Sequence, residues 1–207
     1  GKCLVGAHGA GGEIGHLCVN YQETETCGCG KKGCLEQYAS ATGITRLANM
    51  RLAKDEKPST LRNVAEMSAK EVFDAVKAGD EVAIEIATEF GKYLGHALAN
   101  LAAACDPAVI VIGGGVSKAG EILLEYVEKP FQENAFFANK DVKFALATLG
   151  NDAGICGAAL CAQDPLSCLT AQSQAAAQRR AWRADQLWHA WAHGSPWQVQ
   201  AAAGHSV

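Results

Sequence analysis

The spacing of apolar residues predicts three helices in the first half of the chain. Residues 35–49 and residues 80–104 both carry apolar side chains at intervals that suit one buried helical face. Between them, Ser68 and Glu71 form a capping box, which predicts a shorter helix ending at Gly79. The polar segment 51–67 is predicted to be a loop. The buried faces are expected to hold Leu35, Tyr38, Ala39, Ile44 and Leu47; then Val72, Phe73 and Val76; then Val82, Ile86, Phe90, Leu94, Leu98 and Leu101.

The second half of the chain alternates strands with helices. Residues 108–112 are a continuous apolar run, which is the pattern of a strand buried on both faces of a parallel sheet. The glycines at 113–115 predict a turn, and Ser117 can cap a helix over 118–129. A second strand and a helix of small residues are expected at 142–149 and 153–162. This alternation indicates an α/β layer.

The composition changes after about residue 163. All four tryptophans lie in the last part of the chain, where Ala and Gln dominate and Lys and Glu disappear. We therefore expect one structural unit over 1–163 and an atypical extension of unknown function over 164–207. Trp188 and Trp191 lie in a possible amphipathic helix, so the extension is either aberrant sequence or a small interaction helix.

Charge and composition exclude several classes of function. The 207 residues carry a net charge of −4, which gives no basic surface for nucleic acid. No apolar run reaches the roughly 18 residues that a membrane span needs. Residues 1–20 also lack the basic and apolar pattern of a secretory signal. We expect a cytoplasmic protein that binds neither nucleic acid nor membrane.

Seven of the nine cysteines fall into two groups. Four of them occur in apolar or Gly/Ala-rich surroundings, as buried thiols do: Cys3, Cys105, Cys156 and Cys161. Three others cluster in a short glycine-rich segment, CGCGKKGC at residues 27–34. Glycines at this spacing let the backbone turn tightly enough for the sulfur atoms to converge.

Together with His16, Cys27, Cys29 and Cys34 provide the ligand set of a closed tetrahedral zinc site. Four protein ligands leave no open position on the metal, so the zinc is expected to be structural. The alternative is a chance cluster of cytosolic thiols.

Two carboxylates flank this cluster in sequence. Glu13 lies three residues before His16, at the end of a glycine-rich segment, and Glu36 lies two residues after Cys34. Carboxylates held beside a metal site are suited to accept hydrogen bonds from hydroxyl groups, and the glycines leave room for a polar ring. A solvated glutamate is the ordinary alternative at each position.

Four segments together resemble the ROK family of sugar kinases and repressors, and most closely its bacterial glucokinases. The segments are GAHGAGGEIGH (6–16), CGCGKKGCLE (27–36), VIGGGVS (111–117) and GNDAGICGA (150–158), and the resemblance covers about residues 1–163. It implies an actin-like, hexokinase-like α/β fold that closes on a hexose and on ATP with magnesium, and a homodimer in the complete protein.

The resemblance also implies roles for individual residues. Glu13, His16 and Glu36 would contact the sugar, with His16 also a zinc ligand. The turn formed by Gly113, Gly114, Gly115 and Ser117 would bind the nucleotide, although these glycines would also suit an ordinary strand-to-helix turn.

Other parts of a ROK kinase do not occur in this sequence. Its superfamily uses an Asp-x-Gly-Gly-Thr-type phosphate loop, which does not occur here, and an Asn-Asp pair that supplies the catalytic base; the Asn-Asp pair of this chain, Asn151-Asp152, belongs instead to the segment 150–158. We expect no catalytic residue in this chain, which would be an inactive C-terminal fragment of a glucokinase. The sugar-sensing domain of a ROK transcriptional repressor is the main alternative. A separate zinc-knuckle module is disfavoured by the acidic charge and the α/β remainder.

Overall fold

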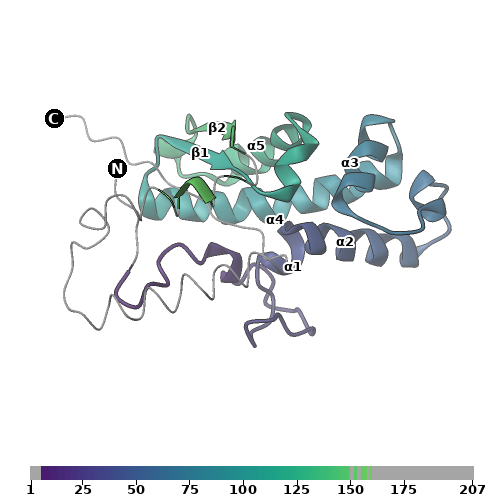
Figure 1. Cartoon of the computed structure of the whole chain (residues 1–207), viewed down its shortest axis with the longest axis horizontal. Helices are drawn as coiled ribbons and strands as arrows, with labels where there is room; N and C mark the ends of the chain where they lie inside the picture. The colour runs from purple at the N-terminus through teal and green to yellow at the C-terminus, as the bar shows by residue number, and fades with distance from the viewer. Residues whose placement is uncertain (1–5, 150–151, 153–154, 158, 160–207) are drawn as a thin grey trace.

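The computed structural model describes residues 6–149, 152, 155–157 and 159. Helix α4 (Glu81–Cys105) is the longest element of this part. In Figure 1, β1, β2 and α5 lie on one side of α4, and α1 and α2 lie on the other. The segment before α1 extends from this body as a long loop. The predicted helix at 153–162 falls largely outside the described residues, and the extension 164–207 falls outside them entirely.

The predicted helix over 35–49 is divided in two, which corrects its expected course. Helix α1 covers Glu36–Ala39 and α2 covers Ala41–Lys54, with Ser40 extended between them. The Ser40 hydroxyl accepts a hydrogen bond from the Gly43 N–H at 2.9 Å and so begins a new helix. A side chain at Gly43 would clash with the backbone of α1, so the two helices meet closely at this point. Helix α2 also continues four residues into the predicted loop.

Capping residues set the starts of the next two helices, the first of them as predicted. Helix α3 (Ala69–Lys77) begins after Ser68, whose hydroxyl accepts from the Lys70 N–H and contacts the Glu71 carboxylate. Helix α4 begins after Asp80, which accepts from two backbone N–H groups of the first turn. A 3-10 helix, η2 (Thr60–Asn63), lies within the segment that was predicted to be a loop.

Strands β1 (Val109–Ile112) and β2 (Lys143–Leu146) pair in parallel, as the alternation with helices predicts. Ile110 and Ile112 are buried, whereas Val109 and Val111, which alternate with them, are only half-buried, so the second face of β1 is less covered than expected. After β1 comes the 3-10 helix η3 (Gly115–Ala119), and α5 covers Ile122–Asn134. Ser117 therefore lies inside η3 and does not cap α5. A further 3-10 turn, η4 (Phe137–Asn139), precedes β2.

The core forms where α4 packs against every neighbouring layer. Phe90 contacts Phe73 of α3 edge to face, and Phe131 of α5 contacts Phe144 of β2 in the same way. Helix α5 approaches α4 closely at Gly91, where an added Cβ would lie 2.0 Å from the Tyr126 carbonyl oxygen. The predicted buried faces are confirmed except for Leu101, which is half-buried.

Two of the cysteines expected to be buried are exposed. Cys105 lies at the last position of α4, and Cys156 is also accessible. Apolar neighbours in the sequence do not guarantee burial at the end of a helix. Cys3 and Cys161 lie outside the described residues. Among the described residues, no helix combines the length and apolar character needed to cross a membrane.

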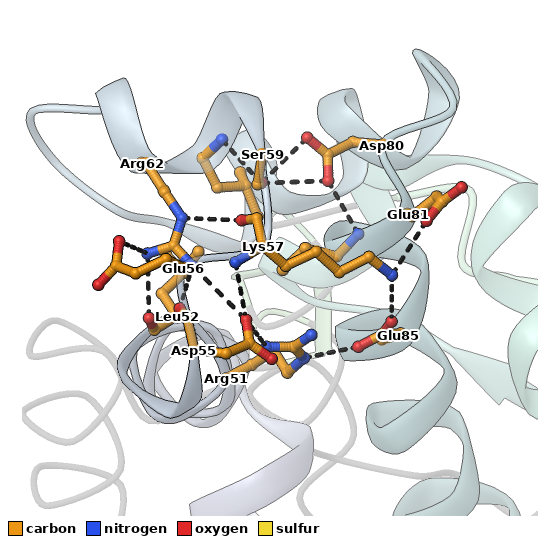
Figure 2. Close-up of polar contacts among 12 residues, drawn as sticks. Arg51, Leu52, Asp55, Glu56, Lys57, Ser59, Arg62, Asp80, Glu81 and Glu85 are labelled. Atoms are coloured by element: carbon orange, nitrogen blue, oxygen red, sulfur yellow. Dashed lines mark hydrogen bonds and ion pairs between the residues drawn. The ribbon is translucent and has the colours of Figure 1, made fainter.

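A network of ion pairs fixes the segment between α2 and η2 to the start of α4 (Figure 2). Arg51 of α2 contacts Glu85 of α4 at 2.5 Å and Asp55 at 3.0 Å. Lys57 reaches Glu81 at 3.0 Å and Glu85 at 2.8 Å. Because most of these carboxylates are substantially exposed, each pair contributes little on its own, and the network acts mainly to fix geometry.

Asp80 is the most highly bonded carboxylate of this region. Besides capping α4, it accepts from the Ser59 hydroxyl at 3.0 Å and from the Thr60 N–H at 2.7 Å. Burial alone would raise the pKa of Asp80, but these hydrogen bonds outweigh burial and lower the pKa below its usual value. Asp80 therefore joins the η2 turn to α4.

We expect Asp80→Ala to lower the free energy of unfolding by about 2 kcal/mol, because the helix cap and the bonds to η2 are lost together. Urea denaturation measures the change. Asp74→Ala is the matched control, since Asp74 forms exposed ion pairs with Lys70 and Lys77, and its loss should change the free energy of unfolding very little. Equal losses in the two variants would contradict this account of Asp80.

Candidate functional site

The long loop before α1 brings the four predicted metal ligands together. His16 ends the short 3-10 helix η1 (Ile14–His16). A tight hairpin follows. In it, Thr26 and Lys32 form an antiparallel β-bridge, and the Cys27 N–H donates to the Lys31 carbonyl at 2.7 Å. The hairpin turns at the Cys27 carbonyl, which accepts from the Gly30 N–H at 2.8 Å. This turn places the cysteine sulfurs on the side that faces His16.

The donor atoms of His16, Cys27, Cys29 and Cys34 all lie within 4.8 Å of one another. Cys27 Sγ is 3.8 Å from His16 Nδ1, and Cys29 Sγ is 3.5 Å from Cys34 Sγ. In a tetrahedral zinc site with usual bond lengths, neighbouring donors are about 3.5–3.8 Å apart. The cluster therefore has the composition and the size to hold one metal ion.

The electrostatic setting of the thiols also suits a cation. Burial, followed by the interactions with the neighbouring Cys29 and Cys27 thiols, raises the pKa of Cys34 to about 12. Burial likewise raises the pKa of Cys27, whereas a hydrogen bond from the Lys31 N–H lowers that of Cys29. Three ionised sulfurs this close together would repel one another, and a bound cation would offset that repulsion.

Glu36 lies directly beside the cluster. It is the first residue of α1, and its Oε1 atom is 3.9 Å from Cys27 Sγ. Gly15 of η1 also lies next to Glu36, since a Cβ added at Gly15 would be in van der Waals contact with the Glu36 Cβ at 3.8 Å. The fold thus fixes one carboxylate between the η1 turn and the metal ligands.

Glu13 takes a different position. It precedes η1, and its backbone carbonyl accepts from the His16 N–H at 3.1 Å, but its side chain is exposed. Within the described ranges no hydrogen bond or ion pair involves the Glu13 carboxylate. The backbone of Glu13 is therefore hydrogen-bonded to His16, whereas its carboxylate points into solvent.

The predicted nucleotide turn follows β1 directly. Gly114 has φ +80° and ψ −168°, a conformation that a side chain would strain, and the Ser117 hydroxyl donates to its carbonyl at 2.7 Å. Gly113 packs against Ala147, whose Cβ would be 3.1 Å from a Cβ at that position. The turn thus leaves Gly115 exposed at the end of the strand.

Sequence reasoning missed several residues that hold the segment from His16 to Cys34 in place. We call this segment the metal loop. The Lys31 ammonium donates to the His16 carbonyl at 2.8 Å and so links the hairpin to η1. Gln37 accepts from the Cys34 N–H at 3.0 Å. Glu23 binds both Tyr38 and Arg46. Nothing in the spacing signals the contacts of Glu23, because α1 and α2 bring Tyr38 and Arg46 to it only in the folded chain.

The Glu23 carboxylate is a site of unusual acidity. Burial would raise its pKa, but hydrogen bonds from the Tyr38 hydroxyl, the Glu25 N–H and the Arg46 guanidinium lower its pKa from 4.5 to about 2. Since the folded pKa lies below the unfolded one, ionised Glu23 stabilises the fold above about pH 4.5, and this contribution is lost as the pH falls toward 2.

We therefore expect the difference in unfolding free energy between the parent chain and Glu23→Gln to shrink from at most about 3 kcal/mol at pH 7 to near zero at about pH 2. Urea unfolding of both proteins in EDTA separates this effect from acid release of metal. Glu25→Gln is the control, because Glu25 is 68% exposed and its pair with Arg46 should contribute under about 1 kcal/mol. Parallel pH profiles for Glu23→Gln and its parent would contradict the prediction.

The sequence matches known proteins over most of the described fold. Residues 1–165 match the ROK family. A glucokinase from Halalkalibacterium halodurans is 44% identical over 161 residues, which are 76% of this chain and 49% of the relative. A xylose repressor from Caldicellulosiruptor bescii is 29% identical over 159 residues, which are 75% of this chain and 40% of the repressor. The chain thus spans about half the length of the curated relatives it matches.

A solved structure gives the same result for the fold. The ROK family glucokinase from Streptomyces griseus, determined in complex with glucose and AMPPNP, superposes with a TM-score of 0.63 at 33% identity. The superposition covers 73% of this chain and 51% of that protein. The described residues therefore have part of the actin-like, hexokinase-like fold of the sugar kinases.

Proposed function

Since the chain belongs to the ROK family, we propose that it is the sugar- and nucleotide-binding part of an ATP-dependent glucokinase, which converts glucose and ATP to glucose 6-phosphate. The kinase relatives support this choice of reaction. The observation that carries the proposal is the carboxylate of Glu36, which the fold holds within 3.9 Å of a cluster able to bind a metal.

The sugar would bind beside this cluster. A carboxylate accepts hydrogen bonds from two hydroxyl groups of a pyranose, and charge makes such bonds stronger than neutral ones. In the proposed site, Glu36 accepts from one pair of hydroxyls, and His16 offers its remaining ring nitrogen, Nε2, to a third. Glu13 reaches the sugar from the other end of η1, where its side chain is free to turn inward.

We propose that the metal is zinc and that His16, Cys27, Cys29 and Cys34 hold it. With all four positions filled by protein, the ion would act as a cross-link that fixes the loop and would take no part in the reaction. Its effect on the sugar is to fix the plane of the His16 ring and the position of the hairpin against Glu36.

The nucleotide would lie against the turn after β1. At Gly113, Gly114 and Gly115 the backbone carries no side chains, so an adenosine group can approach it closely. Ser117 fixes the turn through its bond to Gly114. Phosphoryl transfer additionally needs a base near the sugar hydroxyl and groups that hold the phosphates and magnesium. The sequence contains no Asp-x-Gly-Gly-Thr loop, so we expect no turnover by these 207 residues alone.

Glucose binding by the zinc-loaded chain, followed through NMR chemical shifts, tests the sugar site. Glu36→Gln should weaken binding about 10- to 100-fold, because a charge-assisted hydrogen bond is worth about 1.5–3 kcal/mol. The matched control is Glu66→Gln, an exposed glutamate before α3 that should leave the affinity unchanged. Equal affinities in the parent chain and Glu36→Gln would rule out the proposed role of Glu36.

The likeness to a xylose repressor favours a second candidate, a domain that senses sugar and does not phosphorylate it. The two candidates differ at the turn after β1. A kinase part should bind AMPPNP with magnesium, and a sensing domain need not. Titration of the chain with AMPPNP, compared with a Gly114→Val variant, therefore discriminates between them.

A further inference from the structure

Behind the metal loop lies a group of buried polar side chains that the proposed function does not use. We name this group, Glu23, Tyr38 and Arg46, the clamp. Glu23 belongs to the loop, Tyr38 to α1 and Arg46 to α2. The Glu23 and Tyr38 side chains are almost fully buried, and the Arg46 side chain is 20% exposed. None of the three is among the metal ligands.

The clamp joins the loop to helices α1 and α2. The Arg46 guanidinium binds Glu23 at 2.7 Å and Glu25 at 2.9 Å, and the Tyr38 hydroxyl donates to Glu23. The same hydroxyl accepts from the Asn20 amide at 2.9 Å. The clamp thus holds the segment 20–25, which leads directly into the first cysteine ligand.

The clamp is itself fixed to the core. The Tyr38 ring stacks on Tyr93 of α4 with 4.0 Å between ring centroids, and the Arg46 guanidinium lies over the Tyr38 ring, 5.4 Å from its centroid. Stacked rings and a charged group near an aromatic ring restrict motion further than hydrogen bonds alone. A rigid path therefore runs from α4 through Tyr38 to the metal loop.

We propose that Glu23, Tyr38 and Arg46 are positioning residues, which preorganise the metal loop so that its thiols and Glu36 already face one another before a metal binds. This inference rests on the proposed function, because it concerns the same site. Two positions in sequence separate Glu36 from Tyr38, so the helix that the clamp fixes is also the helix that presents the carboxylate. Ligands held in place by the fold lose less conformational freedom on binding, which raises affinity.

Metal affinity of the full 207-residue chain tests the clamp, with Co²⁺ as a spectroscopic probe and Zn²⁺ in competition with a chelator. Arg46→Met should weaken Zn²⁺ binding on the order of 10-fold or more, the size of effect seen when groups that orient metal ligands are removed. Arg51→Met is the matched control. Arg51 is also a largely buried arginine of α2 with two carboxylate partners, but it lies away from the loop and should leave the affinity unchanged.

Glu23→Gln and Tyr38→Phe keep the shapes of their side chains, and they decide the result if Arg46→Met does not fold. Each should weaken Zn²⁺ binding several-fold and broaden the visible absorption bands of the Co²⁺ complex. Equal affinities for these variants, Arg51→Met and the parent chain would overturn the clamp and leave the proposed sugar site intact. A parent chain that binds no metal would overturn the metal site and the clamp together.

Discussion

Replacing Cys29 by serine should lower the zinc content of the purified chain from about one ion to a small fraction of that value. One ligand of four is lost, and the binding free energy of a structural zinc is about 10–16 kcal/mol, so the loss should be near 3 kcal/mol, or about 100-fold in affinity. Elemental analysis after dialysis against a weak chelator measures the change. Cys29 is the most exposed of the three cysteine ligands, so its replacement disturbs the core least.

Cys18→Ser is the matched control for this variant. Cys18 lies in the same loop, where its backbone forms an antiparallel β-bridge with that of Cys34. Its thiol is exposed, however, and it is not among the four clustered ligands. Its replacement should leave the zinc content near one ion per chain. Equal zinc contents in Cys29→Ser and the parent chain, or a loss confined to Cys18→Ser, would contradict the proposed ligand set.

Gly33→Ala should unfold the metal loop without removing any ligand. Gly33 has φ +73°, which costs other residues about 1–2 kcal/mol, and an added Cβ would lie 1.9 Å from the Asn20 carbonyl oxygen. Because that oxygen belongs to the backbone, one strand of the loop must move. We expect a fall in the melting temperature of the zinc-loaded chain of about 10 °C, which corresponds to about 3 kcal/mol.

Gly28→Ala provides the comparison within the same hairpin. A Cβ at Gly28 would meet nothing within 4 Å, and its φ is not positive. This variant should melt within about 1–2 °C of the parent chain, since a small surface substitution changes stability by less than about 0.5 kcal/mol. Differential scanning calorimetry of the two variants side by side decides the matter, and similar melting points would show that the loop does not need the observed backbone at Gly33.

The amphipathic pattern predicted the helical core well where a capping side chain marked the start of a helix. The Ser68 capping box located the start of α3, and the 3.6-residue repeat located α4 to within one residue at each end. The division at Ser40 was not predicted, because the apolar pattern continues through it and only the contact of Gly43 with α1 requires a break. The predicted start of α5 was also wrong, because Ser117 hydrogen-bonds within its own turn and not to the helix that follows.

In the candidate site too, contacts between residues close in sequence could be predicted, whereas contacts between distant residues could not. The spacing of Cys27, Cys29 and Cys34 sufficed to predict a cluster with His16, because a hairpin brings near neighbours together. The proximity of Glu36 followed from its two-residue distance to Cys34. In contrast, the bond between Glu23 and Arg46 spans 23 positions and depends on how α2 packs, which no local pattern contains.

The proposed sugar site depends on the metal site. X-ray absorption at the zinc K-edge of the zinc-loaded 207-residue chain therefore tests the central claim most directly. We predict three sulfur neighbours at about 2.3 Å and one nitrogen neighbour at about 2.0–2.1 Å. A spectrum with only oxygen and nitrogen neighbours, or with fewer than three sulfurs, would contradict the ligand set of His16, Cys27, Cys29 and Cys34.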